Sequence, residues 1–317
     1  MTIPLPPAIF LMGPTASGKS ALAVELAHAL DGEIISVDSA LVFKGMDIGT
    51  AKPTLADRQG VAHYLIDIID PGEVFSTGQF KNQALDLMAD ISQRGKLPIL
   101  VGGTMLYFNV LTAGLAVLPP ANPKIRAQLD QDLIELGKEV LHQRLADVDP
   151  VSAARIHPND PQRVQRALEV YAISGKPLSA FFSEEPEYRL PYRVTKLIVA
   201  PSDRKILHDV IAQRFMAMLQ QGFMEEVEKL YQRGDLNENL PAIRAVGYRQ
   251  AWSYLKGEID KATMTETAII ATRQLAKRQF TWLRKETDAL NFETGQANLL
   301  KEVLKKLRGL EEHSGLD

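Results

Sequence analysis

Residues Gly13–Ser20 have the sequence GPTASGKS and fit the phosphate-loop pattern G-x-x-x-x-G-K-[ST]. The apolar run Ala8–Met12 before them is typical of a short buried strand, and the stretch Lys19–Leu30 is typical of a helix. Glycines at such a junction let backbone N–H groups converge on phosphate oxygens at a helix N-terminus, where the helix dipole also favours anions. In this pattern the Lys19 ammonium reaches the terminal phosphate and the Ser20 hydroxyl holds Mg²⁺. The sequence therefore predicts a site for a phosphorylated ligand.

A carboxylate follows the second apolar run of the chain. The stretch Glu33–Val37 leads directly into Asp38 and Ser39. Ligands of open α/β sheets bind beyond the carboxyl ends of the strands, so Asp38 is expected beside the phosphate loop, where it could act as a general base. An aspartate at this position could equally cap a turn. The residues alone leave both roles open.

The apolar run Leu97–Val101 ends in Gly102, Gly103 and Thr104, with no acidic residue beside them. Many nucleotide hydrolases place a metal-binding Asp or Glu at such a strand end. The two glycines allow the backbone to approach a ligand closely, and Thr104 could either cap the next helix or donate to a phosphate oxygen. The missing acid favours transfer of a group from a bound phosphate ester over plain ATP hydrolysis.

Apolar runs alternate with helical patterns over the first 120 residues. The predicted strands cover residues 8–12, 33–37, 64–68 and 97–101, and the predicted helices cover 19–30, 78–93 and 104–111. This alternation is typical of a parallel sheet with helices on both faces. With the phosphate loop after the first strand, the expected fold is α/β, with a P-loop NTPase-like core.

The character of the chain changes after Leu118–Pro120. Helical periodicity continues to about residue 183, most clearly in Leu129–Gly137 and in Asp160–Gly175, where Asp160 is the expected N-cap and Gly175 the stop. A strand is expected at Val194–Ala200, and long helices follow to near residue 283. We therefore predict a catalytic core of residues 1–120 and 189–317, and an all-helical insertion domain of residues 121–188.

The composition is that of an ordinary folded protein. Of the 317 residues, 45% are hydrophobic and 24% are charged, which argues against disorder. The lack of cysteine excludes disulfides and thiolate zinc sites. No apolar run reaches the length of a membrane span. We expect a cytoplasmic protein with no membrane partner, and no feature requires more than a monomer.

Positive charge is concentrated near the end of the sequence. The net charge is −3, yet residues 244–285 contain nine basic and three acidic residues, a local charge of +6. A basic face on an acidic protein is expected where a polyanion binds. A solvated helix surface is the alternative explanation.

Seven motifs, in this order, resemble those of the bacterial tRNA dimethylallyltransferases, also called tRNA isopentenyltransferases, of the IPP transferase family. They are GPTASGKS (13–20), DSALVFKGMDIGTAKP (38–53), HYLIDIIDP (63–71), LVGGTMLYF (100–108), RIHPNDPQRVQRALEV (155–170), RAVGYRQ (244–250) and TRQLAKRQFTWLR (272–284). The resemblance spans about residues 8–285, and the second motif is far more specific than the phosphate loop.

This resemblance implies a reaction. Such an enzyme transfers the dimethylallyl group of dimethylallyl diphosphate to N6 of the adenosine 3′-adjacent to the anticodon, in tRNAs that read codons beginning with U. The products are N6-(dimethylallyl)adenosine and diphosphate. The phosphate loop then holds a diphosphate leaving group, which suits the missing strand-end acid. The implied partners are the anticodon stem-loop of tRNA and dimethylallyl diphosphate, with Mg²⁺ on Ser20 as the implied cofactor.

The same resemblance implies roles for individual residues. Asp38 accepts the N6 proton, while Thr104 and Arg214 neutralise the departing phosphate oxygens. The assignment of Arg214 depends on one arginine in a helix, and an ordinary surface charge is its alternative. The residues implied to bind diphosphate are Gly13, Pro14, Thr15, Ala16, Ser17, Gly18, Lys19 and Ser20. The residues implied to contact tRNA are Asp38, Ser39, Ala40, Leu41, Thr104, Arg126, Gln162, Arg163, Val164, Gln165, Arg166, Arg244, Ala245, Val246, Gly247, Tyr248, Arg249, Lys277, Arg278, Gln279, Phe280, Thr281, Trp282, Leu283 and Arg284.

Three of these tRNA contacts carry a structural expectation. Arg163 and Arg166 are three residues apart on one helix, so they can share a face. Trp282 could stack on a base or fill the core, and we favour the core.

Two other functions fit parts of the sequence. In a phosphate-loop kinase, Asp38 would activate a hydroxyl and the helical insertion would act as a lid, but the basic segment 244–285 would have no role. A nucleotide-dependent RNA-binding protein would use the basic segment and would not need Asp38. The transferase uses both features.

Overall fold

A computed structural model describes residues 4–183 and 188–314 of the chain. The chain forms two compact units. The first consists of Met1–Leu111 and Pro191–Asp317, and the second of Thr112–Leu190. The insertion predicted at residues 121–188 lies within the second unit.

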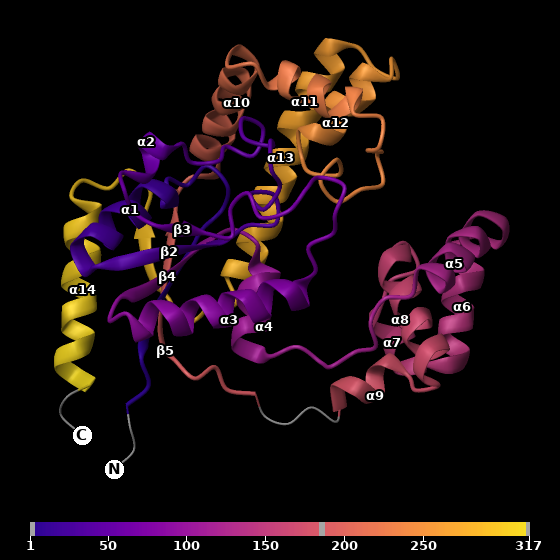
Figure 1. Ribbon diagram of the computed structural model, residues 1–317, viewed down its shortest axis with the longest axis horizontal. Coiled ribbons are helices and arrows are strands. Elements are labelled where there is room, and N and C mark those ends of the chain that lie inside the picture. Colours follow the sequence, from indigo (N-terminus) through magenta and orange to yellow (C-terminus); the bar gives the residue numbers. More distant parts are fainter. Residues whose placement is uncertain (1–3, 184–187, 315–317) are drawn as a thin grey trace. The chain divides into compact units, whose positions relative to one another are not determined.

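Six parallel strands form the sheet of the first unit, in the order β3-β2-β4-β1-β5-β6. Figure 1 labels β2, β3, β4 and β5. The strands are β1 (Pro7–Met12), β2 (Gly32–Val37), β3 (His63–Tyr64), β4 (Leu97–Gly102), β5 (Arg193–Ala200) and β6 (Leu290–Glu293). This sheet confirms the predicted α/β class. The strand predicted at 64–68 is wrong over most of its length, because Leu65 and Asp67 adopt left-handed φ angles of 61° and 56° that interrupt extended pairing.

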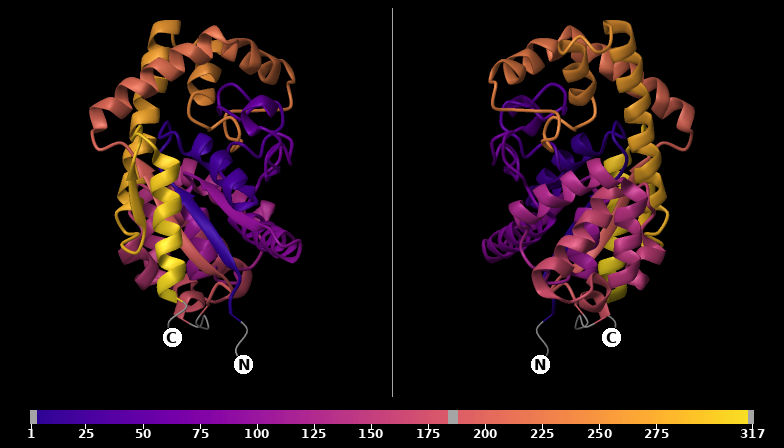
Figure 2. Two further views of the ribbon diagram at one scale, coloured as in Figure 1. Left: turned by 90° about the vertical axis from the view of Figure 1, so that its left-hand side faces the viewer. Right: turned by 90° about the vertical axis from the view of Figure 1, so that its right-hand side faces the viewer.

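Helices cover both faces of the sheet, as predicted. They are α1 (Lys19–Leu30), α2 (Leu55–Arg58), α3 (Thr77–Gln93), α4 (Met105–Ala113), α10 (Arg204–Gln220), α11 (Phe223–Gln232), α12 (Tyr248–Leu255), α13 (Lys261–Leu283) and α14 (Leu299–Ser314). Side chains alternate along β1: Leu11 joins a cluster with Leu26 of α1 and Val303 of α14, whereas the Phe10 ring lies 5.2 Å from that of Phe108 in α4. Figure 2 shows α14, in yellow, alongside the strands.

A second core of the first unit fixes the loop that follows β2. Phe43 and Met46 of this loop are buried in a cluster with Phe223 of α11, Tyr248 and Trp252 of α12 and side chains of α13. The loop after Asp38 is therefore held by the helices that follow β5.

The regular secondary structure in the described part of the second unit is helical. The helices are α5 (Pro123–Leu136), α6 (Lys138–Val148), α7 (Pro150–Arg155), α8 (Pro161–Ser174) and α9 (Leu178–Ser183). The Asp160 side chain accepts from the Arg163 amide at the start of α8, and Gly175 ends it with a φ of 69°, so both predicted caps are confirmed. Leu141, Leu145 and Val164 lie in the core of this unit.

Candidate active site at the carboxyl ends of the strands

The register of the sheet brings three loops of the first unit together. Gly102 at the end of β4 pairs with Met12 of β1 on one side and with Val37 of β2 on the other. The next residues in each chain segment are Gly103, Gly13 and Asp38. The phosphate loop, the predicted base and the glycine pair therefore start at neighbouring positions, as the strand-end argument predicts.

The phosphate loop has the backbone that an anion site requires. Ala16 and Gly18 have φ angles of 63° and 78°, and α1 begins at Lys19 with no side-chain hydrogen bond at its N-cap. A Cβ on Gly13 would lie 2.3 Å from the carbonyl oxygen of Val199, so only glycine lets the loop pass this close to β5. The uncapped first turn of α1 thus presents its amides to an anion.

Two cations and one carboxylate interact at this loop. The Lys19 ammonium donates to the carbonyl of Pro14 at 3.0 Å. Burial lowers the pKa of Lys19 to about 8, the charge of Asp38 opposes this shift, and the charge of Arg214 adds to it. Burial also lowers the pKa of Arg214, against the effect of Asp38. Arg214 is half-buried and interacts electrostatically with both Lys19 and Asp38, so it is not an ordinary surface charge.

Asp38 caps a turn and still has one oxygen to offer. Its Oδ1 accepts from the amides of Ala40 (2.8 Å) and Leu41 (3.4 Å). Within residues 4–183 and 188–314, the Asp38 side chain accepts hydrogen bonds at Oδ1 alone, which leaves Oδ2 for a substrate proton. Burial and then the Asp38 charge raise the pKa of Tyr107 to about 12, so this nearby phenol stays neutral. The turn-cap and general-base roles are therefore compatible.

The Thr104 hydroxyl joins the ends of β2 and β4. Its oxygen accepts from the Ser39 amide at 3.1 Å and lies 3.5 Å from the Ser39 hydroxyl. Helix α4 begins one residue later, at Met105. Thr104 is half-buried, and its O–H, which makes only the long 3.5 Å contact with Ser39, can turn to donate to a ligand beside the phosphate loop.

Helix α13 presents two different faces near its end. Lys277, Arg278, Thr281 and Arg284 are exposed, but Gln279 and Leu283 are buried. The Gln279 side chain, predicted to contact tRNA, points inward instead: its Oε1 accepts from the Thr15 amide and its Nε2 donates to the Gly103 carbonyl, both at 2.9 Å. The Thr15 amide, predicted to bind diphosphate, is therefore bonded within the protein.

The aromatic residues at the end of α13 are only partly buried. Trp282, for which we favoured a core position, is half-buried, and the Lys285 ammonium lies 5.2 Å from its ring centroid. Phe280 packs against Leu207 and Ile211 of α10.

The residues of the predicted tRNA-contact segment 244–249 also differ in exposure. Arg244 and Arg249 are exposed, whereas Gly247 and Tyr248 are buried. Burial and then the charge of Glu226 raise the pKa of Tyr248, whose hydroxyl donates to the Glu226 carboxylate. The structure thus gives Tyr248 a role inside the fold and places the two arginines at the surface.

Glu226 of α11 holds the loop that follows Asp38. Its carboxylate accepts from three consecutive backbone amides, those of Asp47 and Ile48 at 2.8 Å and that of Gly49 at 3.1 Å. Consecutive amides that converge in this way form an anion-binding concavity, which is filled here by a side chain of the same protein. No pattern in the segment EEVEK distinguishes Glu226 from the other glutamates, so the sequence analysis missed it.

In the second unit, a buried carboxylate binds two of the predicted tRNA arginines. Arg126 Nε and Arg166 Nη1 bind Glu169 at 2.9 Å and 2.6 Å, and the Glu169 side chain is 0% exposed. Burial opposes ionisation of Glu169, but these hydrogen bonds hold its pKa below the ordinary value. Arg163 is exposed and pairs with Asp160, so the two arginines of α8 are bound to different partners.

The other predicted contacts of α8 also differ in exposure. Gln162 is exposed, Gln165 donates to Asp130 at 2.7 Å, and Val164 is buried in the core of the unit.

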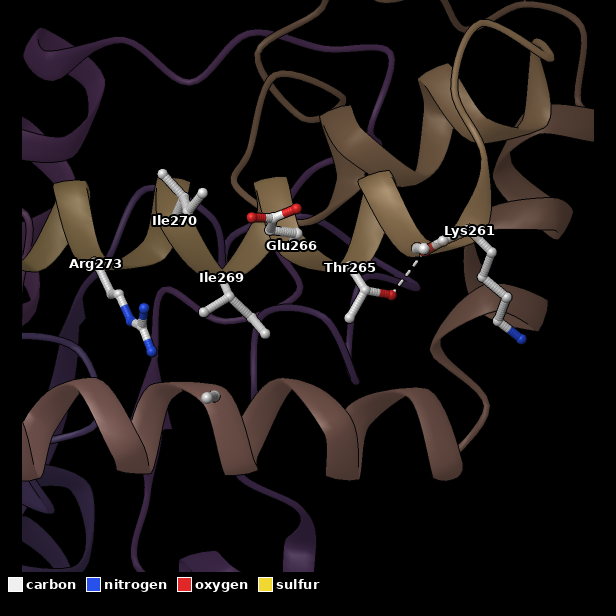
Figure 3. A pocket seen from close by; sticks show the side chains of 8 residues that line it. Lys261, Thr265, Glu266, Ile269, Ile270 and Arg273 are labelled. Atoms are coloured by element: carbon white, nitrogen blue, oxygen red, sulfur yellow. Dashed lines mark hydrogen bonds between the residues drawn. The ribbon is translucent and has the colours of Figure 1, made fainter.

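A separate hollow lies between α10 and α13 (Figure 3). Its volume is about 770 Å³, and its lining is largely apolar. The lining residues are Ala212, Lys261, Ala262, Thr265, Glu266, Ile269, Ile270 and Arg273. None of Lys19, Asp38 and Thr104 is among them, so this hollow is distinct from the candidate active site.

The described residues contain no group of three or more His, Cys, Asp or Glu side chains arranged to hold a metal ion. No helix in the described part of the chain is long and apolar enough to cross a membrane.

A phosphate loop at the carboxyl ends of a parallel sheet, opposed by a carboxylate, defines a P-loop α/β protein. The family model "IPP transferase" matches residues 41–286 of the chain. The chain therefore belongs to the IPP transferase family, and the resemblance seen in the sequence is confirmed.

Curated relatives cover nearly the whole chain. A tRNA dimethylallyltransferase of Methylococcus capsulatus is 59% identical over 304 residues, which make up 96% of this chain and 97% of the relative. A protein of Nitrosococcus oceani with the same name is 55% identical and covers 95% of this chain and 96% of its own length.

Solved structures match the fold as well. A tRNA isopentenylpyrophosphate transferase of Bacillus halodurans is 36% identical, with a TM-score of 0.72 and coverage of 98% of each chain. A eukaryotic dimethylallyltransferase acting on tRNA is 28% identical, with a TM-score of 0.77 and coverage of 91% of this chain and 74% of that one.

Proposed function

We propose that this chain transfers the dimethylallyl group of dimethylallyl diphosphate to N6 of the adenosine 3′-adjacent to the anticodon, in tRNAs that read codons beginning with U. The observation that carries this proposal is the grouping of Lys19 and Arg214 with Asp38 at the phosphate loop. Cations and uncapped amides suit a diphosphate, and a carboxylate beside them suits an amine that must lose a proton. Membership of the IPP transferase family supports the same reaction.

The residues act mainly on charge and position. An adenine N6 is a weak nucleophile, so the barrier falls chiefly through stabilisation of the diphosphate as the allylic C–O bond breaks. Lys19 and Arg214 stabilise that negative charge with their own positive charges. The first-turn amides of α1 and the Thr104 hydroxyl stabilise it by donating hydrogen bonds. As the N6–C bond forms, the N6 proton passes to Asp38 Oδ2, and diphosphate leaves.

The site also fits a Mg²⁺ ion bound together with the diphosphate. Magnesium keeps several waters and takes few protein ligands besides substrate phosphates, so a dedicated carboxylate cage is not needed. Ser20 lies exposed in the first turn of α1, where its hydroxyl can be one ligand. When bound, the ion would neutralise part of the leaving-group charge.

The exposed basic residues supply the tRNA-binding surface in this proposal. Arg244, Arg249, Lys277, Arg278 and Arg284 are all exposed. The target base lies in an RNA loop, where extrusion costs only a few kcal/mol. Because tRNA is a cytoplasmic substrate, the proposed enzyme is cytoplasmic, and one copy of the chain carries every residue used here.

The test uses the purified protein with MgCl₂, unmodified tRNA and either dimethylallyl diphosphate or ATP. Mass analysis of nucleosides from the digested tRNA should show an adenosine that has gained one dimethylallyl group, only in the first reaction. Transfer of the γ-phosphate of ATP to a small alcohol, with the tRNA unchanged, would instead establish the kinase.

Replacement of Asp38 tests the proposed base. Asp38→Ala should lower kcat by about 100-fold or more, the usual contribution of general-base catalysis, while tRNA binding is retained. Asp86→Ala, which changes an exposed aspartate of α3, is the matched control. Full activity of Asp38→Ala would remove Asp38 from the mechanism and favour a role limited to RNA binding.

A further inference from the structure

Gln279 is a buried polar residue in a helix segment whose other polar side chains are exposed. Its exposure is 8%, whereas Lys277, Arg278 and Thr281 on the same helix are exposed. Burial of a primary amide costs free energy unless its donor and acceptor are both bonded. Gln279 satisfies both, and each bond reaches a different segment of the candidate active site.

The two bonds require an amide rather than another group of similar size. Oε1 accepts from the Thr15 amide in the phosphate loop, and Nε2 donates to the Gly103 carbonyl beyond β4. Glutamate has no donor for Gly103, and methionine provides neither a comparable donor nor a comparable acceptor. The side chain thus joins two loops that start at paired strand ends.

Packing around the bonds is tight. A Cβ at Gly103 would lie 2.3 Å from the Gln279 Nε2 atom, so the glycine is required for the amide to fit. One turn earlier on α13, Ala276 is buried with Leu207 and Ile211, and Ala16 of the phosphate loop packs against this cluster. Helix α13 therefore supports two successive residues of the loop, Thr15 through a hydrogen bond and Ala16 through apolar contact.

We propose that Gln279 is a positioning residue for the diphosphate, not a tRNA contact. By fixing the Thr15 amide relative to Gly103, it sets the position of the phosphate loop against the end of β4, where Thr104 lies. The outer face of the same helix carries the proposed tRNA-binding cations, so one helix supports both substrates through opposite faces. This inference deepens the proposed function and depends on it.

The test compares Gln279→Met with wild type and with Gln274→Met, which changes an exposed glutamine on the same helix. We expect Gln279→Met to raise KM for dimethylallyl diphosphate about tenfold, because two hydrogen bonds that shape its site are lost. KM for tRNA should stay within about twofold of wild type. Gln274→Met should match wild type in both values.

These readouts separate positioning from a general loss of structure. A KM does not depend on the fraction of active enzyme, so partial unfolding lowers only the apparent kcat. Gln279→Glu is the second variant: it keeps the acceptor for Thr15 but sets a carboxylate oxygen against the Gly103 carbonyl and near the diphosphate. It should raise the same KM by at least as much as Gln279→Met.

Two results would overturn the inference. Unchanged KM values for dimethylallyl diphosphate in both variants would show that the bonds do not position the loop. A rise in KM for tRNA alone would restore Gln279 as an RNA contact. If wild type transfers no dimethylallyl group, the proposed function fails instead, and calorimetric titration with inorganic pyrophosphate still compares Gln279→Met with wild type.

Discussion

The protonation state of Lys19 should control capture of the allylic diphosphate. Its pKa is lowered to about 8, mainly by burial. At pH 7 about nine-tenths of the free enzyme would carry the ammonium, and at pH 9 only about one-tenth would. Because the neutral amine offers no charge to the diphosphate, kcat/KM for dimethylallyl diphosphate should fall nearly tenfold per pH unit above pH 8.

The assay is the initial rate of transfer at saturating tRNA between pH 7 and 9.5. A decline in kcat/KM reports groups of the enzyme before the diphosphate binds, whereas kcat reports the loaded complex. A bound diphosphate favours the ammonium form of Lys19, so kcat should decline at a higher pH than kcat/KM. This separation of the two profiles is part of the prediction.

Lys19→Arg is the matched variant. Arginine stays charged across this pH range, so the alkaline decline in kcat/KM should disappear in the variant enzyme. The variant should be slower than wild type at every pH, because the guanidinium has a different shape. A wild-type kcat/KM that stays level to pH 9.5 would refute the argument. An equal decline in Lys19→Arg would assign the titration to another group.

Two further predictions concern stability. Hydrogen bonds from Arg94 lower the pKa of Glu33 from 4.5 to about 2, against the effect of burial. This ion pair therefore stabilises the fold fully above pH 4.5, and the stabilisation is lost as the pH falls towards 2. Glu33→Gln should lower the free energy of unfolding at pH 7 by about 3 kcal/mol. In urea titrations, the variant should also show a weaker loss of stability in acid. Glu226→Ala should cost about 2 kcal/mol in the same measurement, since it removes the acceptor of three amides, and Glu225→Ala, at an exposed position, should cost nearly nothing; equal effects would contradict the role of Glu226.

Local chemistry was enough to predict several elements of the fold. The phosphate loop with its helix follows from glycine positions and apolar spacing, and the ends of α8 follow from Asp160 and Gly175. The extent of β3 did not follow, because φ angles at Leu65 and Asp67 depend on tertiary context. Strand β6 has only four residues and is formed by pairing with β5, and no local sequence pattern indicates this pairing.

The site was predictable to the extent that strand ends determine it. Asp38, Lys19 and Thr104 follow strands that pair in one parallel sheet, so their proximity could be inferred. The inward direction of Gln279 could not, because Gln279 directly follows Lys277 and Arg278, two polar residues that are exposed. The role of Glu226 depends on the packing of α11 against a loop almost two hundred residues earlier in the chain. Sequence spacing does not indicate that contact.

The buried glutamate of α8 has a consequence for the cost of RNA binding. Glu169 holds the guanidinium groups of Arg126 and Arg166 in set orientations, and it also accepts from the Asn122 amide at 2.7 Å. Long side chains that are already ordered lose little rotamer entropy when a phosphate arrives. A single anionic side chain therefore prepares two arginines of the helical unit to engage a ligand without rearrangement.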